Sequence, residues 1–161
     1  MDAFLQRLQD SDFGVWVSSA PTLFAYPTIL MLHTVGLALV VGPIAVLSLR
    51  LLGVGQRMPV SIFRNVFTIM WWGFLLNAAT GIALFISEAA EKGEQLDFYI
   101  KLTLIALALI TAMRMKRVIF ANRDDAAVDR QVPRQAKSLA VASLLLWAGA
   151  ITAGRLMAYL K

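Results

Sequence analysis

The chain of 161 residues contains one histidine, His33, and it lies inside an apolar run long enough to cross a bilayer, TILMLHTVGLALVVGPIAVLSLR from Thr28 to Arg50. An ionisable group at such depth is costly unless it is paired, hydrated or able to reach the surface, so it marks a candidate functional site. In this setting an imidazole can hydrogen-bond to a neighbouring helix, coordinate haem iron, bind a quinone or transfer a proton. Which of these it does depends on the residues that surround it.

The residues in register with His33 form one face of the predicted helix. Gly36 follows it on that face and leaves room for another helix or a flat ligand to approach closely. The face should point into the protein, and at steps of three and four it contains His33, Gly36, Val40, Pro43, Leu47 and Arg50.

Three further residues have types and depths that fit the same site. Asn77 falls near the middle of the next apolar segment, and Lys101 lies close to one end of the third. Arg155 lies about five residues, or roughly 8 Å, before the end of the last segment, whereas His33 lies about eight residues, or roughly 12 Å, from the start of its own. The sequence therefore predicts a polar, cofactor-binding site within one leaflet, formed by His33, Gly36, Asn77, Lys101 and Arg155.

The most specific chemical interpretation is haem b. A bundle interior can hold a flat macrocycle, an imidazole can bind its iron axially, and basic residues near the membrane surface can meet its propionates. His33 would then be the metal ligand, with Arg155 and Lys101 as partners of the propionates. One histidine cannot supply two axial ligands in a monomer, so the iron would be five-coordinate, or a methionine would bind it, or two protomers would share a haem. A quinone that accepts hydrogen bonds from His33 or Arg155 is the alternative cofactor.

The same residues also have a structural interpretation. A neutral His33 can hydrogen-bond across the bundle, Asn77 can do so between helices, and Lys101 can extend its ammonium group to the headgroups. The protein would then be a non-catalytic scaffold or a transporter subunit, and the sequence leaves open whether it is an enzyme. The absence of cysteine excludes disulfides, thiolate metal sites and covalently attached haem. No phosphate-binding loop or nucleophile elbow is found.

Composition requires that membrane helices position these residues. Hydrophobic residues make up 59% of the chain and the mean hydropathy is +0.70, more than one soluble core of this length can hide. The apolar runs are continuous, whereas strands of a lipid-facing barrel alternate apolar and polar residues. We therefore predict one all-α transmembrane domain over residues 1–161, an integral membrane four-helix bundle with crossings at about 24–49, 66–87, 98–115 and 139–160. An N-terminal amphipathic helix within residues 1–20 is expected to lie in the interface.

Basic residues are concentrated in two connections. Arg50–Arg64 contains three and Arg114–Lys137 contains seven, so ten of the fifteen lysines and arginines fall there, while the hairpin SEAAEKGEQLDF is mainly acidic. Positive-inside bias therefore predicts a bacterial inner-membrane protein with both termini in the periplasm and the polar site in the outer leaflet. The net charge of +5 reflects this topology and contact with anionic lipids, and no nucleic-acid-binding motif is found.

The third segment has the shortest uncharged stretch. Twelve residues separate Lys101 from Arg114, too few to span about 30 Å of hydrocarbon. We expect both cations to extend toward the surfaces and the helix to pack over much of its circumference. The stripe expected to face inward contains Lys101, Ile105, Ala108, Ala112 and Met115.

Several stretches carry a family resemblance that covers most of the chain. HTVGLALVVG with the following LRLLG, then WWGFLLNAATGIALF, FYIKLTLI and WAGAITAGRLMAYL, resemble an uncharacterised family of small four-helix bacterial inner-membrane proteins. The pattern is more distantly similar to copper-resistance D-type membrane domains and small b-type cytochrome bundles, although the several intramembrane histidines of a typical bis-histidine cytochrome b are missing. The resemblance implies the fold and the compartment.

The sequence thus predicts haem-based or quinone-linked electron transfer at an outer-leaflet site. The expected partners are the lipid bilayer and either a homo-oligomer or a larger membrane complex.

Overall fold

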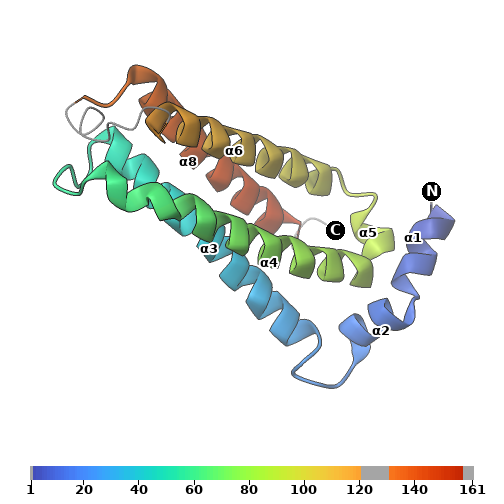
Figure 1. Cartoon of the computed structure of the whole chain (residues 1–161). Coiled ribbons are helices and arrows are strands. Elements are labelled where there is room, and N and C mark those ends of the chain that lie inside the picture. The colour runs from blue at the N-terminus through green and yellow to red at the C-terminus, as the bar shows by residue number, and fades with distance from the viewer. Residues whose placement is uncertain (1, 121–130, 158–161) are drawn as a thin grey trace.

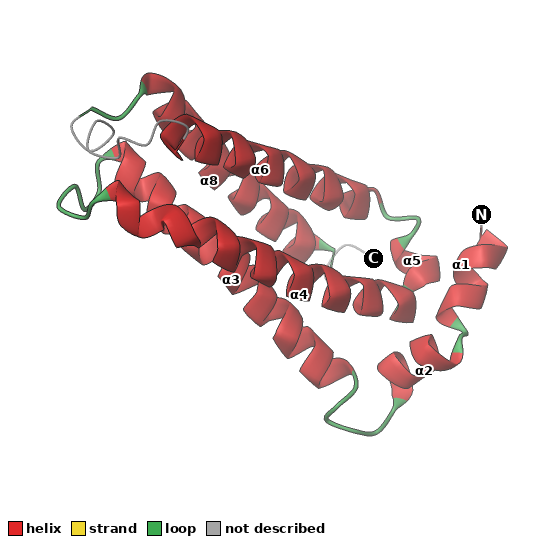
Figure 2. Cartoon of the chain, in the orientation of Figure 1, coloured by secondary structure: helices red, strands yellow, loops and turns green. Residues whose placement is uncertain are grey.

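Helices form all the regular structure in the computed structural model, which describes residues 2–120 and 131–157 (Figure 2). The four long apolar helices pack as a bundle, as predicted (Figure 1): α3 (Tyr26–Leu52), α4 (Val66–Ser87), α6 (Leu96–Phe120) and α8 (Arg134–Leu156). A 3-10 helix, η1 (Val60–Asn65), runs directly into α4. Each of the four is long and apolar enough to span a bilayer, so the chain is a multi-pass membrane protein.

The predicted crossings differ from the helices mainly at their ends. α6 continues to Phe120 and α8 begins at Arg134, because basic residues in a terminal turn stay helical while their side chains extend to water. α8 ends at Leu156, earlier than the predicted crossing, whose residues 158–160 lie outside the described ranges. α3 ends at Leu52 and is capped by Gly53, whose φ of 109° suits glycine, and the Val54 N–H donates to the carbonyl of Leu49 at 2.9 Å.

The N-terminal segment forms two short helices rather than the single interfacial helix that was predicted. α1 (Asp2–Gln9) and α2 (Asp12–Ser19) are separated where the Ser11 hydroxyl accepts a hydrogen bond from the Gly14 N–H at 3.2 Å and so caps α2. α2 packs on α4, and α1 packs on α5 (Ala89–Lys92) in the α4–α6 connection. Figure 1 shows both helices lying beyond the ends of the long helices. We call this end of the bundle the termini end.

Small residues decide which of the long helices pack closely. A Cβ on Gly36 would lie 2.7 Å from the Asn77 backbone nitrogen, and one on Gly73 would lie 2.6 Å from the Leu39 Cβ, so α3 and α4 touch backbone to backbone. Buried alanines bring α6 and α8 together in the same way, and α3 also packs on α8. α4 and α6 are not a closely packed pair within the described residues. The helices are therefore arranged in the order α4, α3, α8, α6.

The inward stripe predicted for α6 is confirmed, but its packing over much of its circumference is not. Ala108, Ala112 and Met115 are fully buried. Leu107 and Ile110, on other faces of α6, are exposed. α6 is 25 residues long, and its charged residues lie toward its two ends, outside the apolar centre. The helix is therefore long enough without neighbours on all sides.

The well-packed core occupies only part of the bundle. Its fully buried side chains come from the half near the α3–η1 and α6–α8 connections, and they include Ile44, Leu47, Phe67, Met70 and Met115. Figure 1 shows α3 and α6 diverging toward the termini end. Around His33 the bundle is consequently more open, and two cavities lie there.

Candidate functional site

His33 and Asn77 join α3 to α4 through two hydrogen bonds. The imidazole Nδ1 lies 3.0 Å from the Asn77 backbone oxygen, and the Asn77 side-chain Nδ2 donates to the His33 backbone oxygen at 2.8 Å. A carbonyl oxygen only accepts, so Nδ1 carries the proton. Nδ1 also lies 3.1 Å from the Thr80 hydroxyl, which donates its own proton to the Leu76 carbonyl at 2.7 Å. The predicted hydrogen bonding of His33 and Asn77 between helices is confirmed.

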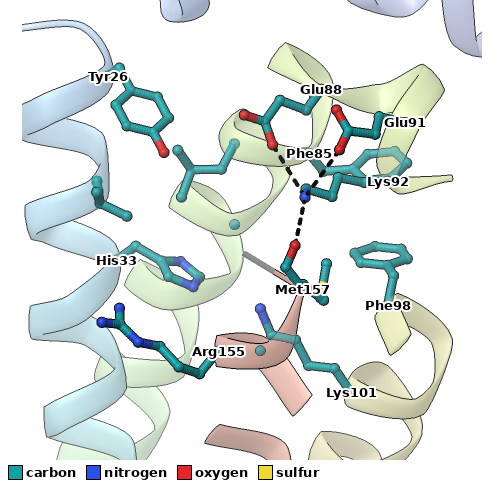
Figure 3. A pocket seen from close by; sticks show the side chains of 14 residues that line it. Tyr26, His33, Phe85, Glu88, Glu91, Lys92, Phe98, Lys101, Arg155 and Met157 are labelled. Carbon is teal, nitrogen blue, oxygen red and sulfur yellow. Dashed lines mark hydrogen bonds and ion pairs between the residues drawn. The ribbon is translucent and has the colours of Figure 1, made fainter. Parts of the chain in front are cut away.

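The second imidazole nitrogen of His33 stays open. Within the part of the chain that the structure describes, Nε2 makes no hydrogen bond, and with Nδ1 protonated it is a free acceptor in a neutral ring. Figure 3 shows the ring pointing from α3 into a cavity. Gly81 lies beside it, and a Cβ there would be 3.1 Å from the His33 Cε1. The ring is thus fixed at one nitrogen and available at the other.

The cavity that His33 faces, which we call the polar cavity, has a volume of about 470 Å³. It lies at the termini end between α3, α4, α6 and α8, and the half-buried Lys101 faces it from α6 (Figure 3). Lys101 lies five residues after Leu96, the first residue of α6, hence about 8 Å along the helix axis. Its side chain lies along α8, where a Cβ on Gly154 would be 3.4 Å from Lys101 Cε.

Arg155 also lines the polar cavity, from a place nearer its helix end than the sequence predicted. It is exposed and is the second-last residue of α8, so one residue of the helix follows it instead of about five. The apolar residues after Arg155 had suggested a longer helix. Of the two cations that share the cavity with His33, Lys101 is the more buried.

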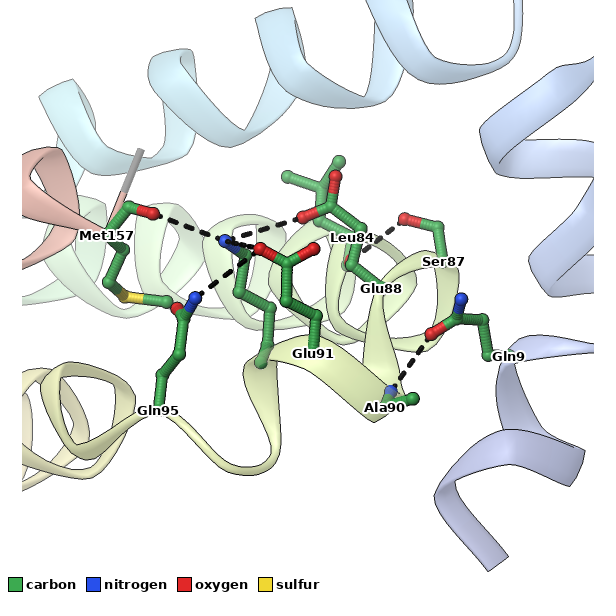
Figure 4. Close-up of polar contacts among 9 residues, drawn as sticks. Gln9, Leu84, Ser87, Glu88, Ala90, Glu91, Gln95 and Met157 are labelled. Atoms are coloured by element: carbon green, nitrogen blue, oxygen red, sulfur yellow. Dashed lines mark hydrogen bonds and ion pairs between the residues drawn. The ribbon is translucent and has the colours of Figure 1, made fainter. Parts of the chain in front are cut away.

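A charged cluster of Glu88, Glu91 and Lys92 lines the polar cavity, and Figure 4 shows its contacts. Lys92 Nζ donates to the Met157 backbone oxygen at 3.3 Å and lies 3.7 Å from Glu88 Oε2 and 4.0 Å from Glu91 Oε1. These contacts tie α5 to the end of α8. The N-terminal arm is fixed to the same place, since the Ala90 N–H donates to Gln9 Oε1 at 2.9 Å.

A second cavity of about 420 Å³, which we call the apolar groove, runs between α4 and α6. One aromatic pair that bridges the two helices lines the groove, and a second such pair lies beyond it. Phe85 and Phe98 stack near His33, with ring centroids 4.9 Å apart and planes 16° apart, and Phe67 meets Phe120 edge to face at 6.2 Å near the other end of the helices. The polar cavity and the groove share five lining residues: His33, Gly81, Phe85, Phe98 and Lys101.

The structure brings together four of the five predicted site residues around these cavities. His33 and Lys101 line both, Asn77 lines the groove and Arg155 the polar cavity. Gly36 lines neither and instead forms the α3–α4 contact. Sequence reasoning did not assign Thr80, Phe85 or Phe98 to the site; Thr80 follows Asn77 by one helical turn, but nothing in the sequence indicates that the two phenylalanines meet.

Chemically, the site offers one neutral imidazole acceptor, one deep ammonium group and aromatic walls. Groups of three or more histidine, cysteine or acidic residues that could hold a metal ion do not occur among the described residues, so a metal here would have to depend on His33, on Met157 of the same cavity or on ligands of its own cofactor. Comparisons with protein families, with curated proteins and with solved structures gave no match to this chain.

Proposed function

We propose that the protein binds a membrane quinone at this site and takes part in electron transfer. The observation that supports this best is the open Nε2 of His33 in a cavity that also receives the Lys101 ammonium group. A quinol hydroxyl can donate to a neutral imidazole nitrogen, and a quinone carbonyl can accept from an ammonium group. A ring placed between the two residues would thus find a partner for each of its oxygens.

His33 would orient the ring and accept one proton when a quinol is oxidised. That reaction releases two electrons and two protons, so the electrons need an acceptor such as a haem or iron–sulfur protein in the same membrane complex. Glu88 and Glu91 lie on the water side of the polar cavity and would receive protons from it. By the positive-inside argument this side is periplasmic, in a bacterial inner membrane with both termini outside.

Haem b is a second candidate, favoured by the way His33 is held. Ligating histidines commonly donate Nδ1–H to a carbonyl or carboxylate while Nε2 binds the metal, and the His33 bond to Asn77 has this form. Lys101 and Arg155 line the cavity where propionates would lie. The ring would occupy the space next to His33, with the iron five-coordinate, or bound also by Met157 of the same cavity, or shared with a second protomer.

Two measurements on protein purified in mild detergent test both candidates. Extraction and chromatography should find bound quinone, and the loss of one charge-assisted hydrogen bond, about 1.5–3 kcal/mol, should lower binding at least ~10-fold in Lys101→Met. His33→Leu should have an effect of similar size. Lys116→Met is the matched control, because Lys116 lies on the same helix over the Phe67 ring at the far end.

The absorption spectrum separates the candidates. A Soret band that disappears in His33→Leu would establish haem in place of quinone. If the wild-type protein shows neither a Soret band nor retained quinone, and added quinone does not bind, the cofactor proposal is wrong. His33 and Asn77 then serve only to join helices in a scaffold or transporter subunit.

A further inference from the structure

The apolar groove opens on the surface that faces lipid. Ile82 of α4 is 60% exposed and Leu102 of α6 is 46% exposed, and both line it. Along α6 the lining runs from Phe98 to Leu109, eleven residues or about 16 Å, so the groove extends from the polar cavity toward the middle of the membrane.

An apolar space of about 420 Å³ open to hydrocarbon does not remain empty in a bilayer, because its walls gain dispersion contacts from any chain that enters. Its width has a structural cause. Gly36 and Gly73 draw α4 toward α3, and buried alanines draw α6 toward α8, while the two bridging phenylalanine pairs hold α4 and α6 apart. The groove is therefore a built feature of the packing.

The charged and titratable lining of the groove lies at the end that joins the polar cavity. His33 and Lys101 belong to both cavities, and Phe85 and Phe98 form an aromatic wall at the junction. Asn77 also lines the groove, and its side-chain nitrogen donates to the His33 backbone oxygen. A ligand that fits both spaces has a planar head with hydrogen-bonding oxygens and one long apolar chain.

We propose that the apolar groove holds the prenyl chain of the quinone, and that quinone reaches His33 sideways from the bilayer through the opening between α4 and α6. This inference rests on the proposed function and assigns the class of ligand, a prenylated quinone, which haem b is not. The ring lies at the junction beside His33, Lys101 and the Phe85–Phe98 pair. The chain runs along the groove past Ala78 and Ala106.

Two quinones with the same ring test the assignment in full-length protein in phosphatidylcholine nanodiscs. Ubiquinone-2 carries two isoprene units and ubiquinone-0 carries none. Ala78→Phe and Ala106→Phe place a large side chain in the groove, and each should weaken ubiquinone-2 binding at least 10-fold while changing ubiquinone-0 binding less than 3-fold. Ala79→Phe is the matched control, because Ala79 is exposed and lines neither cavity.

The outcomes separate the two proposals. If the groove variants bind ubiquinone-2 as the wild type does while His33→Leu and Lys101→Met do not, the chain lies elsewhere, and this inference is overturned while the proposed function stands. If neither quinone binds the wild-type protein, the proposed function fails and the groove holds lipid chains only.

A measurement on wild-type protein avoids dependence on the folding of the variants. A ubiquinone analogue with a diazirine at the end of its chain should crosslink to the α4 and α6 groove residues when irradiated, as located by mass spectrometry. Excess ubiquinone-2 should prevent these adducts. Adducts found only on outward residues such as Leu145 of α8, and unaffected by ubiquinone-2, would overturn the inference.

Discussion

His33 and Asn77 bind each other reciprocally across the α3–α4 interface, each offering its backbone oxygen to the side chain of the other at 3.0 and 2.8 Å. The arrangement fixes the imidazole tautomer and gives the Asn77 side-chain nitrogen an acceptor on the neighbouring helix. Because one nitrogen of the ring is used structurally and the other is open, a structural role and a ligand-binding role for His33 are compatible.

Removal of the amide is expected to destabilise the bundle modestly. Asn77→Ala loses the hydrogen bond to the His33 carbonyl, and such interhelical bonds in membranes contribute about 0.6 kcal/mol and at most about 1.7. Thermal unfolding in detergent should show a decrease of that size in the free energy of unfolding. Thr111→Ala, which removes a bond within α6 to the Leu107 carbonyl, is the control and should leave the transition unchanged. An equal decrease in both variants would show that the interhelical bond has no special weight.

Two glycines of α3 should respond oppositely to the same substitution. A methyl group on Gly36 would meet the Asn77 backbone, which cannot move without separating α3 from α4, so Gly36→Ala should cost about 1–3 kcal/mol. Gly42 has open space around it, and Gly42→Ala should be neutral or slightly stabilising because alanine favours helix. The unfolding temperatures of the two variants test this prediction. An unchanged unfolding temperature in Gly36→Ala would mean that α3 and α4 are not in such close contact.

The face on which a residue lies within a single helix was predictable from the sequence, because the helical period of about 3.6 residues and the count of residues along the helix determine it. The predicted inward face of α3 is found, with Gly36, Val40, Leu47 and Arg50 all buried. The inward stripe of α6 is found for the same reason. The four-helix membrane bundle follows from segment lengths and hydropathy alone.

Features that depend on two helices at once were not predictable. Nothing local indicates that Phe85 would stack on Phe98, or that α4 and α6 would be left apart, because these results reflect which glycines and alanines face each other. The distance of Arg155 from the end of its helix was misjudged for a different reason. Hydropathy registers the apolar residues that follow it but not the end of the helix at Leu156.

The burial of the two cations indicates which should matter more for binding. Lys101 is half-buried, where water screens its charge less, and Arg155 is exposed at the end of α8. Lys101→Met should therefore lower quinone affinity at least ~10-fold, and Arg155→Met less than ~3-fold. Equilibrium titration in nanodiscs measures both. A larger loss of affinity in Arg155→Met than in Lys101→Met would support the central role that the sequence suggested for Arg155.

The stacked Phe85–Phe98 pair should select flat ligands. Phe98→Leu keeps an apolar side chain of similar size but removes the aromatic face at the junction of the two cavities, and aromatic pairing contributes about 0.5–1.5 kcal/mol. We expect a ~2- to 10-fold loss of quinone affinity. Phe120→Leu changes the corresponding pair at the other end of the same helices and should not affect binding. Equal losses in both variants would attribute the effect to helix spacing.

The side of the membrane on which His33 lies can be tested in the intact chain, because the protein contains no cysteine of its own. Gln56, between α3 and η1, and Glu94, between α5 and α6, are both exposed and lie in connections at opposite ends of the bundle. Arginines flank the first connection, whereas acidic residues surround the second, so positive-inside bias places Glu94 and the nearby polar cavity outside. In intact spheroplasts a membrane-impermeant maleimide should label Glu94→Cys and should label Gln56→Cys only after the membrane is permeabilised. The opposite labelling pattern would place His33 and Lys101 in the cytoplasmic leaflet, and protons released from the site would then enter the cell.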